Sequence, residues 1–169
     1  MAKPLRTIPD QASVVLDTNI VVYALSPQSQ FHTACTRLLE RGALQAVMLY
    51  LVVNTVAEII HRVMVMELLA QGTFAQASDA VMHLKHHPQV VQQLTRYKTV
   101  LRDLKQARIT ILPLTYRDLH ASRRYRETYG LLTNDSLIVA AMQREHITYL
   151  ATNDTDFGRI PGLAIRMPD

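Results

Sequence analysis

The chain has 169 residues, close to the roughly 150 of one average domain, and 49% of them are hydrophobic against 19% charged. This composition excludes wholesale disorder, and the lack of any apolar run near the ~20 residues of a bilayer span excludes a membrane helix. A single cysteine, Cys35, excludes internal disulfides and four-cysteine zinc sites, and no apolar segment follows the basic N-terminal residues, so a cytoplasmic protein without a secretory signal is expected.

Apolar spacing alternates between the patterns of strands and helices along the whole chain. In chain order it predicts a strand at 13–17, helical turns at 20–25, a helix at 31–41, a strand at 46–53, helices at 55–70, 74–85 and 89–107, a strand at 109–114, helices at 115–129 and 134–145, and strands at 147–151 and 163–166. Gly42 and Gly130 stand where glycines end helices.

This order of elements is typical of an α/β fold, a three-layer sandwich with a central, mostly parallel sheet. The stretch 59–107 contains no predicted strand, so it is expected to project from the sheet as a helical arm. We expect one domain over residues 1–169, with residues 1–12 as an N-terminal extension.

Positive charge is concentrated in one segment. Residues 96–126 hold nine of the 18 lysines and arginines against two aspartates, so this segment carries +7 while the whole chain carries +4. Such a block indicates a polyanionic partner, most simply RNA, with Arg123, Arg124 and Arg126 as candidate contacts. Solvated helix surfaces explain the block equally well.

Five acidic residues stand where the carboxyl edge of a parallel sheet is expected. They follow strands or open helices: Asp17, Glu58, Asp135, Asp154 and Asp156. Ligands of open α/β sheets bind at this edge, and right-handed crossovers bring all these positions to one rim. Carboxylate oxygens suit Mg²⁺ and Mn²⁺, and two such ions about 4 Å apart can activate water against a phosphodiester.

Each acid also has an ordinary structural explanation. The acids that follow strands could be turn residues. Glu58 could close a capping box with Thr55, and Asp135 could stabilise a helix N-terminus through the helix dipole. None of these explanations predicts that all the positions fall on one edge.

Four motifs in order resemble those of PIN-domain ribonucleases, and most of all the VapC toxins of bacterial and archaeal toxin–antitoxin pairs. They are Val14-Val-Leu-Asp17-Thr-Asn19, the mid-helix Glu58, Leu132-Thr-Asn-Asp135-Ser-Leu-Ile-Val-Ala-Ala, and Leu150-Ala-Thr152-Asn-Asp154-Thr-Asp156-Phe157. The similarity extends from about residue 13 to residue 167. It implies a parallel-sheet fold and a Mg²⁺- or Mn²⁺-dependent endoribonuclease.

The resemblance also implies roles for single residues. Asp17, Glu58 and Asp135 would bind the metal, with Asp154 or Asp156 as the fourth acid, an alternative that the sequence leaves open. The residues that would orient carboxylates or a substrate phosphate are Thr18, Asn19 and Thr152. A small antitoxin would cover the acidic cleft, with the apolar stripe of the 59–69 helix as its groove. The same stripe could instead be core, or the seam of a homodimer.

Other functions remain open at this point. Compared with typical VapC toxins, the chain has about twelve residues before the first strand and extra helical sequence around 73–90, which an RNA-processing PIN nuclease could carry. A PIN-like RNA-binding module without cleavage would tolerate loss of acids, yet all are present. Haloacid-dehalogenase-like phosphatases are set aside because they need an aspartate where this chain has Asn19.

Overall fold

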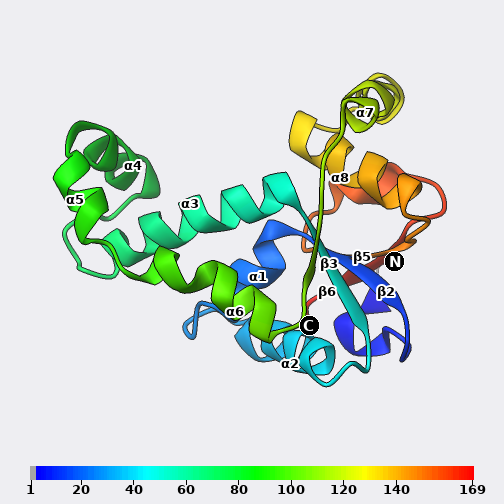
Figure 1. The fold of residues 1–169 in the computed structure, drawn as a ribbon, viewed down its shortest axis with the longest axis horizontal. Coiled ribbons are helices and arrows are strands. Elements are labelled where there is room, and N and C mark those ends of the chain that lie inside the picture. Colours follow the sequence, from blue (N-terminus) through cyan, green and yellow to red (C-terminus); the bar gives the residue numbers. More distant parts are fainter. Residues whose placement is uncertain (1–2) are drawn as a thin grey trace.

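The computed structural model describes residues 3–169 and contains one six-stranded sheet in which every pairing is parallel (Figure 1). The strands are β1 (Lys3–Pro4), β2 (Ser13–Leu16), β3 (Met48–Val52), β4 (Thr110–Leu112), β5 (Tyr149–Ala151) and β6 (Ala164–Met167), in the spatial order β1-β6-β5-β2-β3-β4. The predicted mostly parallel sheet is confirmed. Because every strand points the same way, all their carboxyl ends lie at one edge.

Helices cover both faces of this sheet. They are the 3₁₀ turn η1 (Leu5–Thr7), α1 (Thr18–Ala24), α2 (His32–Ala43), α3 (Val53–Leu69), α4 (Ala77–His86), α5 (Pro88–Gln93), the 3₁₀ turn η2 (Arg96–Thr99), α6 (Val100–Gln106), α7 (Tyr116–Tyr129), α8 (Thr133–Arg144) and the 3₁₀ turn η3 (Asp156–Arg159). The predicted three-layer α/β sandwich is therefore confirmed.

Alternation along β2 shows how the short apolar strands form two cores. Val14 and Leu16 pack into a cluster with residues of α1, α2, α3 and α6. Val15, between them, packs into a second cluster with residues of α7 and α8. All three side chains are fully buried, as expected for a central strand with helices on both sides.

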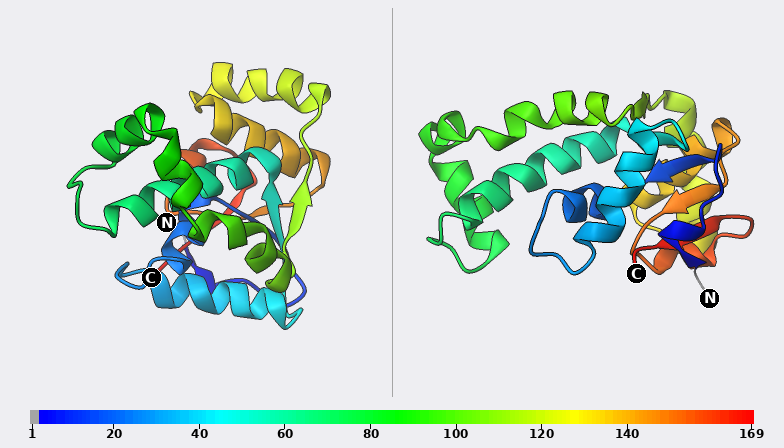
Figure 2. Two further views of the ribbon diagram at one scale, coloured as in Figure 1. Left: turned by 60° about the vertical axis from the view of Figure 1, so that its left-hand side comes forward. Right: turned by 90° about the horizontal axis from the view of Figure 1, so that it is seen from below.

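The stretch between β3 and β4 extends away from the sheet as the predicted arm (Figures 1 and 2). It has a small core of its own around Leu68, Ala80 and Leu94. The single helix predicted at 89–107 is wrong, because the chain breaks after Gln93 into η2 and α6. The Glu67 carboxylate causes the break, since it accepts backbone N–H bonds from Thr95 and Arg96, each at 2.8 Å.

Gly42 does not end its helix as predicted, because α2 continues through it to Ala43. The glycine instead allows α2 to lie close to β3. A Cβ at this position would stand 2.8 Å from Leu49 Cγ and would overlap the Leu49 side chain. Gly130, by contrast, is the predicted cap, with φ of 68° at the C-terminus of α7.

The residues before β2 are integrated into the fold. β1 pairs with β6, and Leu5 and Ile8 are buried in the core beside α2. Residues 1 and 2 of the expected N-terminal extension lie outside the described residues. Across residues 3–169, no helix is both long and apolar enough to cross a membrane.

Candidate metal centre

Asp17 follows β2 directly and caps the N-terminus of α1. Its carboxylate accepts hydrogen bonds from the Thr18 backbone N–H at 2.6 Å, Asn19 Nδ2 at 2.5 Å and Thr152 Oγ1 at 2.7 Å. The three residues expected to orient carboxylates therefore all lie around Asp17. Two different loops of the sheet edge hold this carboxylate in place, since Thr152 follows β5.

Glu58 lies in the second turn of α3 and faces Asp17 across Thr18. The capping box considered for it is wrong, because α3 begins at Val53 and Thr55 is already inside the helix. Glu58 Oε2 instead accepts a bond of 3.1 Å from Thr18 Oγ1. Its other oxygen, Oε1, forms an ion pair of 3.0 Å with Arg62, one helical turn further along.

Asp135 enters the rim from the other face of the sheet, in the first turn of α8. Burial raises the pKa of its carboxyl group to about 6, and the negative charges of four other acids contribute to the shift; they are, in decreasing order, Asp17, Asp154, Glu58 and Asp156. The four other acids predicted from the sequence thus all act on Asp135 across the sheet edge. Their uncompensated negative charge is what a divalent cation would neutralise.

The two remaining acids, Asp154 and Asp156, both follow β5 but differ in their interactions. Asp154 raises the pKa of both Asp17 and Asp135, whereas Asp156 makes the smallest of the four contributions to Asp135. Asp156 is also held in an ion pair of 2.7 Å with Arg159. The fourth acid stays a prediction, and these electrostatic differences favour Asp154 for it.

Asp17 combines burial with strong hydrogen bonding. Burial raises the pKa of its carboxyl group, and the nearby Glu58 and Asp154 add to this, while the bonds from Thr152 and Thr18 oppose it. The balance is a pKa above the usual value. A cation nearby would stabilise the charged form of this buried carboxylate and offset the repulsion from its acidic neighbours.

These residues fit a hard divalent cation by their chemistry, since the donors are carboxylates and hydroxyls around concentrated negative charge. In residues 3–169, however, no three acidic, histidine or cysteine side chains lie close enough together to hold one ion. Two of the five acids are paired with arginines. Arg62 holds Glu58 and Arg159 holds Asp156, each through an ion pair of 3.0 Å or less.

Sequence reasoning missed both of these arginines. Arg62 follows Glu58 by four residues, and Arg159 follows Asp156 by three, which is the spacing at which charged side chains meet on a helix. That spacing was therefore a usable signal. The bond of 3.3 Å from Asn153 Nδ2 to Tyr23 Oη, which fastens the loop after β5 to α1, had no such signal.

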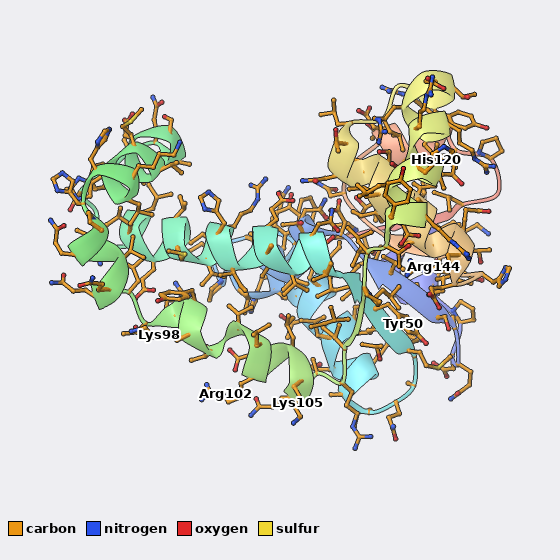
Figure 3. All side chains as sticks on the ribbon, turned by 45° about the horizontal axis from the view of Figure 1, so that its top comes forward. Tyr50, Lys98, Arg102, Lys105, His120 and Arg144 are labelled. Carbon is orange, nitrogen blue, oxygen red and sulfur yellow. The ribbon has the colours of Figure 1, made fainter. Side chains whose placement is uncertain are left out.

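The basic segment does not form one surface. Lys98, Arg102 and Lys105 lie along the arm, whereas His120 marks α7, on the other side of the molecule (Figure 3). β4 separates these two groups in the chain, and α7 packs mainly on α8. The charge of +7 counted along the sequence is thus divided between two distant helices.

The three arginines predicted to contact RNA differ in their surroundings. Arg123 and Arg124 are exposed, the first paired with Glu127 at 2.6 Å and the second stacked on the Tyr125 ring. Arg126 is half-buried and donates to the hydroxyls of Ser122 at 2.7 Å and Ser136 at 3.0 Å, joining α7 to α8. All three stay predictions as RNA contacts.

Replacing Arg126 with alanine should lower the free energy of unfolding by about 1–3 kcal/mol, because two buried serine hydroxyls lose a charged donor. Urea unfolding measures this change. The matched control is Arg123→Ala, which removes only an exposed ion pair and should change stability by less than about 0.5 kcal/mol. Equal effects of the two substitutions would contradict this assignment.

RNA contact is better tested by neutralising Arg123 and Arg124 while leaving Arg126 in place.

An apolar groove of about 290 Å³ adjoins the acidic rim. It lies between α1, α3 and α4, and its lining residues are Val22, Glu58, His61, Arg62, Val65, Met66, Leu69, Ala77 and Val81. Met66 and Val22 belong to none of the packed cores in the described chain. Part of the stripe predicted on the 59–69 helix is therefore left open beside Glu58.

The sequence model of the PIN domain matches residues 14–163, which is most of the chain. The protein belongs to the PIN-domain family. The match begins at β2 and ends after η3, so it contains all five acids of the rim. No curated protein sequence is significantly similar to the chain.

Solved structures with the same fold come from toxin–antitoxin systems. VapBC2 of Rickettsia felis, bound to a DNA fragment from its promoter, is 21% identical with a TM-score of 0.57, over 93% of this PIN-domain chain and 99% of that chain. A toxin–antitoxin complex of Klebsiella pneumoniae is 20% identical with a TM-score of 0.57, over 92% and 98%. The sarcin–ricin-loop-cleaving toxin VapC20 of Mycobacterium tuberculosis is 14% identical with a TM-score of 0.54, over 90% and 98%. At these identities the likeness establishes a shared fold.

Proposed function

We propose that this PIN-domain protein is a divalent-metal-dependent endoribonuclease that acts as the toxin of a VapC-like toxin–antitoxin pair. The carrying observation is that Asp135, in the first turn of α8, lies among acids of other elements; burial raises the pKa of its carboxyl group to about 6, and the negative charges of those acids contribute. This concentrated negative charge lies where the strands of the parallel sheet end. It suits a site that neutralises itself by binding Mg²⁺ or Mn²⁺.

Asp17, Glu58, Asp135 and Asp154 are the residues that would hold the metal. When bound, the ion would supply positive charge at the scissile phosphate and lower the pKa of water, which is how divalent ions assist phosphodiester hydrolysis. Asn19 and Thr152 fix the Asp17 carboxylate for this purpose, and Thr18 joins it to Glu58. These contacts make the centre rigid on the Asp17 side.

The toxin role rests on two supports beyond the acids. The proteins of similar fold include a toxin–antitoxin complex of Klebsiella pneumoniae and VapC20, a toxin that cleaves the sarcin–ricin loop. The apolar groove between α1, α3 and α4 adjoins Glu58, so a partner segment lying in it would also reach the acids. An apolar segment followed by an arginine or lysine is the partner chemistry that fits.

RNA cleavage by the purified protein should stop in EDTA and return when Mg²⁺ or Mn²⁺ is added in excess. The physical reason is that repelling carboxylates cannot polarise a phosphate without the cation they would hold. Electrophoresis of a labelled RNA, with and without each ion, measures this. A metal-free protein that still cuts RNA, or one that cuts no RNA under any metal condition, would contradict the proposed activity.

A further inference from the structure

Both oxygens of the Glu58 carboxylate accept hydrogen bonds from groups of its own chain. Thr18 Oγ1 donates a hydrogen bond of 3.1 Å to Glu58 Oε2. The Arg62 guanidinium contacts Glu58 Oε1 through both Nε and Nη2, each at 3.0 Å. Thr18 lies toward Asp17, but Arg62 lies one turn further along α3, toward the arm. The two partners therefore pull the carboxylate in opposite directions, one toward the acidic rim and one away from it.

The arginine has no other use in the described fold. Its side chain is 58% exposed and joins no buried cluster in residues 3–169. An i,i+4 ion pair this exposed contributes little to helix stability. What distinguishes it from an ordinary surface pair is its acidic partner, which is 32% exposed and one of the acids that act on Asp135.

We propose that Arg62 is a positioning residue that holds Glu58 outside the metal site, so that a divalent cation binds only by displacing the guanidinium. This inference rests on the proposed function, since it requires Glu58 to be a metal ligand. The acid that Arg62 pairs with is one of the four whose negative charges act on Asp135. Arg62 thereby weakens metal binding and lowers the fraction of protein that is loaded.

The groove gives this competition a physical connection to partner binding. Arg62 lines the groove together with Glu58, Val65 and Met66, so a segment seated there would contact the guanidinium directly. A partner that leaves the pair intact would keep Glu58 held back.

Electrostatics gives the expected size of the effect. A divalent ion on the rim would lie a few ångströms from the guanidinium, in a partly solvated environment where like charges repel noticeably. Removing the positive charge also frees Glu58 to bind. Arg62→Gln should therefore bind Mn²⁺ about three- to tenfold more tightly than the wild type.

The experiment titrates Mn²⁺ into metal-free full-length protein and follows free Mn²⁺ by electron paramagnetic resonance, so that no cleavage assay is involved. Arg62→Lys keeps the charge and should stay within about twofold of the wild type. The matched control is Arg123→Gln, which removes one charge from an i,i+4 pair on α7 that includes none of the five acids. It should leave the affinity unchanged.

Tighter binding by Arg62→Gln alone supports the inference, because loss of a merely structural contact would weaken the site. Unchanged or weaker Mn²⁺ binding by Arg62→Gln overturns the inference. If the wild type binds Mn²⁺ in that case, the proposed function still stands. Equal tightening in Arg123→Gln also overturns the inference, since net charge alone would then be responsible. A wild type that binds no Mn²⁺ contradicts the proposed function itself, and with it this inference.

Discussion

Asp135→Asn should reduce RNA cleavage by at least about a hundredfold while leaving the metal-free protein no less stable than the wild type. Activity falls because the amide cannot replace a carboxylate as a ligand of a hard cation. Stability is retained because Asp135 is half-buried among four other acids, and its negative charge is opposed by its surroundings. Asp17→Asn is a less clear test, since its amide would meet donors that now bond the carboxylate.

The stability effect has a definite pH dependence. The folded-state pKa of Asp135 is about 6, above the value of 3.8 for an unperturbed carboxyl group, so the folded protein binds this proton more tightly than the unfolded chain. The resulting stabilisation is complete below about pH 4 and is lost as the pH rises through about 6. The shift corresponds to about 3 kcal/mol at most, and solvent screening of a half-buried group reduces this to about 1 kcal/mol.

Thermal unfolding in EDTA at pH 4 and pH 7 measures this difference. Between pH 4 and pH 7 the wild type should lose more stability than Asp135→Asn does. Asp17 leaves some pH dependence of stability in both proteins. Asp79→Asn, at an exposed position of α4, is the control and should keep wild-type cleavage and wild-type pH dependence. Strong cleavage by Asp135→Asn, or a large loss of its stability at pH 7, would show that Asp135 has a structural role instead.

The sheet and the acidic rim could be predicted because both depend on local patterns. Short apolar runs form the buried strands, and an acid just after such a run must lie at the carboxyl edge once the strands are parallel. Asp17 and Asp154 are of this kind. The choice between Asp154 and Asp156 depends on the course of the loop after β5, which no local pattern contains, although the spacing of Asp156 and Arg159 was a signal for their ion pair.

Other features depend on contacts between distant segments, which no local pattern contains. The break in the helix predicted at 89–107 is caused by Glu67, 28 residues away from Thr95. Gly42 is required by its contact with Leu49 on β3, and not by the end of its own helix. The basic segment illustrates the same limit, since a charge count along the chain cannot show that β4 divides it between two helices.

The apolar groove leads to the second large effect. Changing Val22 and Met66 together to asparagine should weaken antitoxin binding by at least about a hundredfold, because each amide would be buried without a partner in an apolar interface. The two residues lie on opposite walls, α1 and α3, and outside the packed cores, so the fold should tolerate both changes. Neutral amides also leave the charge of the acidic rim unaltered.

The measurement is growth and co-purification in cells that express the PIN-domain chain with its proposed antitoxin, sought as a small protein encoded directly beside it. The wild-type chain alone should arrest growth, and the small protein should relieve the arrest and co-purify with it. The double variant should still arrest growth, but without relief. Met82→Asn changes an exposed methionine of α4 outside the groove and should be relieved like the wild type. If the double variant is relieved normally, the antitoxin binds elsewhere.

If the wild-type chain cleaves RNA in vitro but is harmless alone, an RNA-processing role replaces the toxin role, because an unrestrained nuclease with this open rim should damage its own cell.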